Sequence, residues 1–198
     1  MMADFSEIDP NRLAAVLYRP QDDVDALLLD FAHDLKRRGE RVGGIVQHNL
    51  KDDRGKQAGM QVIDLLSGRA ISICQPLGSG ATACKLDASG LAEASVAVAH
   101  AIGASVDLIV FNKFSKQEAS GQGLRSEFAE AITAGVPVLT AVPQKCFEDW
   151  CAFTGDIGTT LLCERQAIEG WWRELSARLA RVRSNAPRAI YRSSHPTT

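Results

Sequence analysis

Residues 13–46 read LAAVLYRPQDDVDALLLDFAHDLKRRGERVGGIV, the pattern of a strand, a helix and a second strand in direct succession. The apolar run Leu13–Tyr18 is typical of a buried strand, and apolar residues then recur at helical spacing from Val24 to Leu35. Lys36-Arg37-Arg38-Gly39 is a good helix end, because cations complement the C-terminal dipole and glycine accepts a left-handed conformation. With Val42–Val46 as the second strand, the succession predicts a right-handed βαβ unit with parallel strands.

The same alternation continues along the chain. His48 to Gly59 is polar and is predicted as a loop, and two strand-like runs around Ser67-Gly68 predict an antiparallel hairpin. The unbroken apolar run Leu108–Phe111 predicts a central strand, because strands buried on both faces are apolar throughout. Further helices are predicted at 87–102, from 124 and from 168 to 182, and further strands at 136–141 and 160–163. The predicted fold is α/β: a doubly wound, mostly parallel sheet with one antiparallel hairpin.

Size and composition favour one globular domain. The chain has 198 residues, and we expect a single α/β domain over 12–183 with flexible termini at 1–11 and 184–198. A net charge of −2 gives no general attraction for nucleic acid or anionic lipid, so neither is expected as a partner. The apolar stretches are too short to span a bilayer, and the five cysteines are irregularly spaced. We therefore expect a cytoplasmic protein with reduced thiols, and the sequence leaves a homo-oligomer open.

Three stretches resemble small P-loop nucleoside triphosphatases. The first strand, turn and helix occupy the place of a Walker A unit, residues 41–68 look like the second strand and hairpin, and 108–118 look like the Walker B strand and its following loop. The chain also resembles an uncharacterised bacterial family, a domain of unknown function whose members are often encoded near molybdate-transport genes. This second resemblance covers roughly residues 12–175 and is most specific through 75–87 and 112–125. It implies a P-loop-like fold and a link to molybdenum metabolism.

The sequence departs from the P-loop pattern at two places. A Walker A loop needs glycines, a lysine and a hydroxyl residue between strand and helix, but the segment after Tyr18 carries Asp22, Asp23 and Asp25 instead. These carboxylates would repel a triphosphate and are predicted to cap the helix. Asn112 stands where a Walker B aspartate would help to hold Mg²⁺. The Walker motifs are therefore degenerate, and hydrolysis of Mg-ATP at the usual site is not expected.

The first candidate site is the glycine-rich stretch from Gln75 to Asp87. Glycines permit conformations in which successive N–H groups point at one anion, and hydroxyl and ammonium groups add donors. The alternative is a flexible connection with Asp87 as the cap of the next helix. The candidate ligand-binding residues are Gly78, Ser79, Gly80, Thr82 and Lys85.

The second candidate site follows the predicted central strand. Open α/β sheets bind ligands at the carboxyl ends of their strands, and cations there would attract an anion. Glu118 is a candidate base, or pairs with a neighbouring lysine; a solvated charged loop is the alternative reading of the whole run. We expect both stretches to line one anion pocket. The candidate residues here are Asn112, Lys113, Lys116, Glu118 and Arg125.

Three functions remain open from the sequence. The first is a degenerate P-loop-like binding protein for a small oxyanion or a nucleotide, linked through the family resemblance to molybdenum metabolism. The second is a nucleoside triphosphatase or phosphotransferase with a non-standard phosphate site. The third is a non-catalytic partner protein, which an exposed apolar patch near Trp171 or Trp172 would favour. No metal site is expected, and the sequence assigns neither a catalytic residue nor a cofactor.

Overall fold

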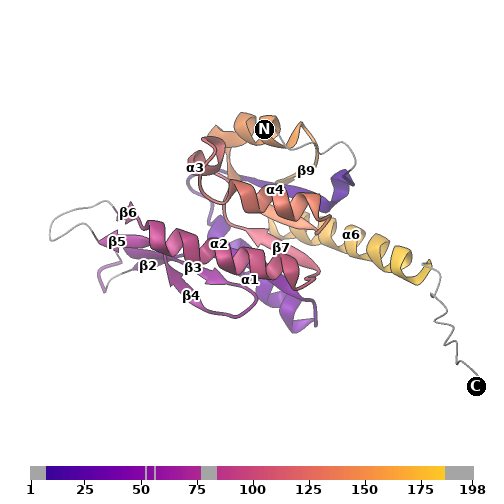
Figure 1. The fold of residues 1–198 in the computed structure, drawn as a ribbon, viewed down its shortest axis with the longest axis horizontal. Helices are drawn as coiled ribbons and strands as arrows, with labels where there is room; N and C mark the ends of the chain where they lie inside the picture. Colours follow the sequence, from indigo (N-terminus) through magenta and orange to yellow (C-terminus); the bar gives the residue numbers. More distant parts are fainter. Residues whose placement is uncertain (1–7, 52, 56, 77–83, 186–198) are drawn as a thin grey trace, which may run out of the picture.

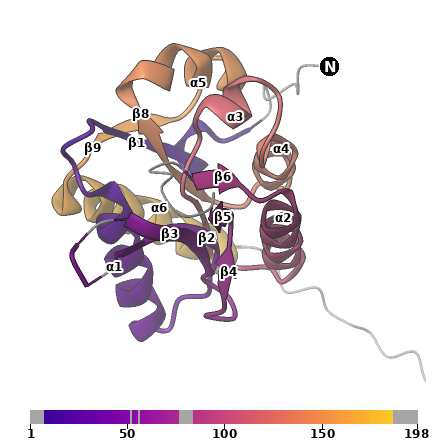
Figure 2. The same ribbon diagram turned by 90° about the vertical axis from the view of Figure 1, so that its left-hand side faces the viewer.

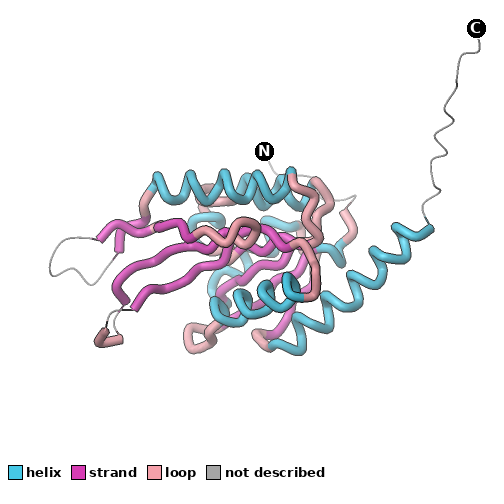
Figure 3. Tube along the Cα trace, turned by 90° about the horizontal axis from the view of Figure 1, so that it is seen from below, coloured by secondary structure: helices cyan, strands magenta, loops and turns pink. Residues whose placement is uncertain are grey.

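The computed structural model describes residues 8–51, 53–55, 57–76 and 84–185. It has three layers, with a seven-stranded sheet between two layers of helices (Figures 1 and 3). The predicted doubly wound α/β fold is confirmed. The predicted flexible termini lie largely outside the described residues and stay a prediction.

The sheet has the strand order β4-β3-β2-β7-β8-β1-β9. β1 and β2 run parallel, as predicted, but β7 and β8 lie between them. The apolar run at 108–111 is β7, the fourth of the seven strands, and all its residues are buried. The strands are β1 (Leu13–Tyr18), β2 (Val42–Lys51), β3 (Gln57–Asp64), β4 (Ala70–Ser72), β7 (Leu108–Phe111), β8 (Val138–Pro143) and β9 (Thr159–Leu162).

Helices cover both faces of the sheet, and each face has its own apolar core. One core joins the sheet to α1 and α6, and includes Phe31 and Trp172. The other joins it to α2, α4 and α5, around the packed rings of Phe111, Phe114 and Phe128. Figure 2 shows α2 and α4 together on one side and α1 on the other. The helices are α1 (Val24–Arg37), α2 (Ala88–Gly103), α3 (Lys116–Ala119), α4 (Arg125–Thr133), α5 (Phe147–Thr154) and α6 (Arg165–Asn185).

Two predicted loops contain strands. β2 continues to Lys51 and β3 begins at Gln57, so most of the predicted loop 48–59 is an antiparallel pair. Polar side chains of this strand pair contact one another, as in the 3.1 Å contact between Gln61 Nε2 and His48 Nδ1. The stretch 75–87 contains the paired strands β5 (Cys74–Pro76) and β6 (Cys84–Leu86), so β6 separates the glycines from α2.

Candidate functional site

The carboxyl ends of β1 and β8 form a switch point of the sheet. β1 leads into α1 on one face, whereas its neighbour β8 leads into α5 on the other face. Loops that leave adjacent strands in opposite directions open a crevice, and open α/β sheets bind their ligands there. The ends of β7 and β2 lie next along the same edge. The second candidate stretch, which follows β7, is therefore in the place where this fold builds sites.

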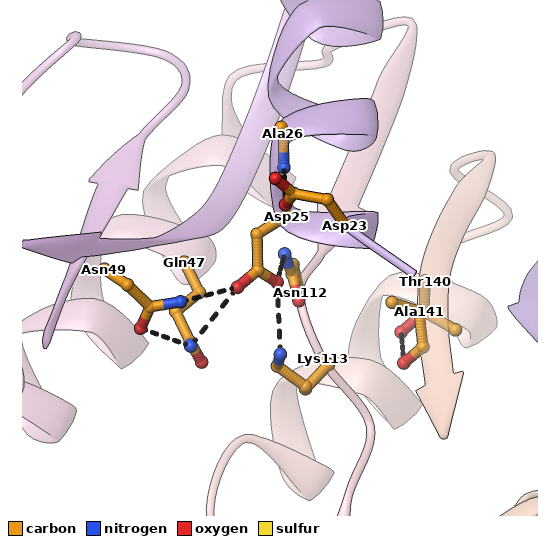
Figure 4. Close-up of polar contacts among 9 residues, drawn as sticks. All are labelled: Asp23, Asp25, Ala26, Gln47, Asn49, Asn112, Lys113, Thr140 and Ala141. Atoms are coloured by element: carbon orange, nitrogen blue, oxygen red, sulfur yellow. Dashed lines mark hydrogen bonds and ion pairs between the residues drawn. The ribbon is translucent and has the colours of Figure 1, made fainter. Parts of the chain in front are cut away.

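Asp25 joins three elements at this edge (Figure 4). Its Oδ1 accepts hydrogen bonds from Asn112 Nδ2 at 2.8 Å and from Lys113 Nζ at 3.1 Å. Its Oδ2 accepts from Asn49 Nδ2 at 3.0 Å and from Gln47 Nε2 at 3.4 Å. The side chain on α1 therefore holds the ends of β2 and β7 together, and Lys113 is already neutralised by a carboxylate.

The first turn of α1 is capped by its own sequence. Asp23 Oδ1 accepts a hydrogen bond from the backbone N–H of Ala26 at 3.1 Å, and Asp22 Oδ2 accepts from the backbone N–H of Arg19 at 2.7 Å. The predicted capping role of these carboxylates is seen at Asp23. Asp25, which was predicted to share that role, instead points to Asn112 and Lys113, because the helix turns its side chain toward the sheet.

Tyr18 lies between the capped turn and the loop after β7. The ammonium group of Lys113 is 5.3 Å from the centre of the Tyr18 ring. Burial raises the pKa of Tyr18 above its usual 10.0, against the opposing effect of Lys113. The phenol is therefore protonated at neutral pH and can donate a hydrogen bond.

Two cavities of opposite character meet at Tyr18 and Pro20. The acidic cavity has a volume of about 340 Å³ and contains Lys113 together with Asp22, Asp23 and Asp25. The cationic cavity has a volume of about 510 Å³, and the described residues that line it include two lysines and no carboxylate. An anion is therefore favoured in the second and disfavoured in the first. The cationic cavity is lined by Tyr18, Pro20, Ser115, Lys116, Pro143, Gln144 and Lys145.

Lys116 and Lys145 lie at the two sides of the crevice. Lys116 begins α3, after β7, and Lys145 follows β8. Both side chains are exposed, and neither forms an ion pair with a described residue. Lys145 is absent from the sequence-derived candidates, because a single lysine after a strand has no distinctive pattern.

Glu118 and Arg125 have structural contacts. Glu118 is 6% exposed, and its carboxylate accepts from Ser115 N at 2.9 Å and Leu124 N at 3.2 Å, which closes a capping box on α3. Arg125 Nη1 donates to Glu118 O at 2.9 Å, and its guanidinium stacks 4.4 Å from the Phe153 ring centre. Both residues shape the loop after β7. Glu118 is not exposed as a base would be, and the guanidinium of Arg125 is occupied by its contacts with Glu118 O and Phe153.

The first candidate stretch is described only in part. Gly78, Ser79, Gly80 and Thr82 lie outside the described residues, as does the side chain of Lys85. The expectation that this stretch shares a pocket with Asn112 therefore stays a prediction. Of the remaining candidates, Asn112 and Lys113 contact Asp25, and Lys116 lines the cationic cavity.

The expectation of reduced thiols is wrong for Cys74, which is disulfide-bonded. Cys74 begins β5, which pairs antiparallel with β6. Cys146, Cys151 and Cys163 are free. Within the described ranges, no three His, Cys, Asp or Glu side chains gather as a metal site, and no helix is long and apolar enough to cross a membrane.

Comparison with solved structures confirms the fold. The chain resembles the protein reported as "Solution Structure of a Human Cancer-Related Nucleoside Triphosphatase", with a TM-score of 0.56 and 16% identity over 89% of this chain and 100% of that one. At this identity the likeness shows the fold alone. The predicted resemblance to nucleoside triphosphatases is thus borne out in architecture.

Comparison with curated sequences finds a much longer relative. The chain is 72% identical over 185 residues to "Molybdenum import ATP-binding protein ModC 2" of Bradyrhizobium diazoefficiens. The match covers 93% of this chain and 21% of that protein, so the chain spans about a fifth of its relative's length. Residues 13–171 also match the family described as "Protein of unknown function (DUF2478)". That match contains all seven strands of the main sheet, so the chain belongs to the DUF2478 family.

Proposed function

We propose that this domain binds a tetrahedral oxyanion, either free or as the phosphate group of a nucleotide, in the cationic cavity. One observation carries the proposal: Lys116 and Lys145 line a cavity without a described carboxylate, at the switch point of the sheet. The protonated hydroxyl of Tyr18 and the amide of Gln144 add uncharged donors to the same cavity. A volume of about 510 Å³ is in the range of small-molecule sites.

The named relative supports molybdate as the first ligand to test. That protein is called a molybdenum import ATP-binding protein, and the region it shares with this chain is 72% identical. Molybdate is a tetrahedral dianion, which two lysines and neutral donors can neutralise and orient. We propose that the domain senses or holds this oxyanion beside the import machinery.

Binding without hydrolysis is the form of the proposal that the geometry supports. The N–H groups that would receive a phosphate at the start of α1 are partly satisfied by Asp23. Asn112 has an amide where Mg²⁺ would need a carboxylate, and that amide donates to Asp25. Trp171 and Trp172 are 8% and 5% exposed, so they do not form the apolar patch that would favour a partner protein.

The test is calorimetric and thermal titration with sodium molybdate, tungstate, sulfate and phosphate, and with ATP with and without Mg²⁺. A ligand at 100 times its Kd adds about 2.7 kcal/mol of stability, which raises the Tm of a chain of this size by about 5–10 °C. The double variant Lys116→Ala/Lys145→Ala is expected to weaken oxyanion binding at least tenfold. Arg173→Ala, which removes an exposed cation from α6, is the matched control and is expected to bind as wild type.

Two results would contradict the proposal. The first is an absence of any shift with all the oxyanions and nucleotides. The second is binding that survives in the double variant. Release of phosphate from ATP in the presence of Mg²⁺ would instead support the nucleoside triphosphatase alternative.

A further inference from the structure

A third cavity lies beside the loop after β7, between α2, β2, β3 and the segment that precedes α4. Its volume is about 190 Å³, and we call it the apolar cavity. Apolar side chains from β2, β3 and α2 and from the neighbouring loops form most of its wall. Six of them are Ile45, Met60, Val62, Leu91, Ala94 and Leu124.

One polar atom in this wall has no partner. Asn112 is 4% exposed, and its Oδ1 is buried without a hydrogen bond to any described residue. The orientation of the amide is fixed by chemistry, since the carboxylate of Asp25 accepts at 2.8 Å and only the Nδ2 end can donate to it. Oδ1 is on the other branch of the amide. Asn112 lines the apolar cavity but neither the cationic nor the acidic one.

The charged side chains of the cavity already have partners. Glu118 accepts from Ser115 N, Ser115 Oγ and Leu124 N, at 2.9, 3.3 and 3.2 Å. Lys113 Nζ donates a hydrogen bond to Asp25 Oδ1 at 3.1 Å and forms an ion pair with it. The cavity therefore offers no free cation for an anion, and its unmet requirement is a donor to one buried oxygen, which is costly to leave unsatisfied.

We infer that the apolar cavity binds one neutral, planar heteroaromatic ring system, held by a ring N–H that donates to Asn112 Oδ1. The apolar walls match the faces of such a ring, and the buried acceptor Asn112 Oδ1 matches a single N–H at its edge. A volume of 190 Å³ is that of about six water molecules at ~30 Å³ each, and is below the ~300 Å³ at which sites for whole drug-sized ligands begin. The ligand is thus a ring system and not an entire nucleotide.

This inference is independent of the proposed oxyanion site. Lys116 and Lys145 do not line the apolar cavity, and the ligand class is neutral where the other is anionic. Each site can therefore be shown or refuted while the other stands.

The experiment compares two probes of the same shape by NMR titration of ¹⁵N-labelled protein. Indole has a ring N–H, and benzofuran has an oxygen at that position. We expect saturable shifts of the Gly123 and Leu124 amides, which border the cavity, and tighter binding of indole by about 2- to 12-fold, the value of one net hydrogen bond. Equal affinity of the two probes, or no saturable shift with either, would overturn the inference.

Two variants of α2 locate the probe. Leu91→Trp fills the cavity from its wall and is expected to abolish indole binding while molybdate binding stays as in wild type. Val96→Trp adds the same ring to the same helix at a position that is 69% exposed, and is expected to leave indole binding unchanged. Circular dichroism and Tm check that both variants are folded. Indole binding that persists in Leu91→Trp would place the probe elsewhere and overturn the assignment.

Discussion

Replacing Asp25 with alanine removes the acceptor of four side-chain donors on β2 and after β7. The ion pair with Lys113 is largely buried, with exposed fractions of 19% and 16% for the two side chains. An exposed pair is worth about 0–1 kcal/mol, and removal of one partner of a fully buried pair costs about 3–5 kcal/mol. For this intermediate burial, with buried amides also left unpaired, we expect a loss of about 2–4 kcal/mol.

Urea unfolding followed by circular dichroism measures this loss, and the Tm should fall by about 4–16 °C. The control is Asp30→Ala, which removes the same charge from an exposed position of α1 and should change stability by less than about 0.5 kcal/mol. A double-mutant cycle with Lys113→Ala isolates the pair. If Asp25→Ala unfolds within 0.5 kcal/mol of wild type, then Asp25 does not hold the two strand ends together and the reasoning is wrong.

Three further predictions concern the frame of the site. Gly44 has a φ of +94°, and an added Cβ would lie 2.1 Å from a carbonyl oxygen of β7. Gly44→Ala should therefore lower the free energy of unfolding in urea by at least about 3 kcal/mol. Gly39→Ala is the control, because Gly39 has a φ of +90° but open space around it, and should cost only about 1–2 kcal/mol. Hydrogen bonding to Arg165 lowers the pKa of Asp34 below its usual 3.8. The stability that Asp34 contributes is therefore present above pH 3.8 and is lost as the pH falls through the lowered pKa. The Tm difference between wild type and Asp34→Asn should accordingly shrink from pH 7 to pH 2. Phe114, fully buried among three aromatic rings, should cost about 3–5 kcal/mol when changed to alanine, and an equal Tm for variant and wild type would contradict the packing described.

The sequence predicts those elements whose own residues have a distinctive pattern of apolar and polar positions. The run 108–111 is apolar at every position because both of its faces are covered, and it is the central strand β7. The extension of β2 to Lys51 was missed because polar residues in a strand are stabilised by a partner strand that the local pattern does not reveal. Lys145 was missed for a similar reason, since only the strand order brings the end of β8 beside Lys116.

Asp25 shows the limit of local reasoning at the site itself. Near a helix start an aspartate is expected to act on the helix dipole, and nothing in the neighbouring residues indicates another role. Its partners Asn112 and Lys113 are 87 and 88 positions away in sequence. Such a contact depends on the arrangement of the whole sheet, and so do the cavities on either side of it.

The cap on α1 has a consequence for redesign. Because Asp23 already satisfies the N–H of Ala26, inserting one lysine after β1 would not recreate a phosphate cradle. An incoming phosphate would have to compete with a carboxylate that is covalently part of the same turn and has a very high effective local concentration. A phosphate site designed at this position would therefore need several simultaneous substitutions in the connection from Arg19 to Asp23, and no single one would suffice.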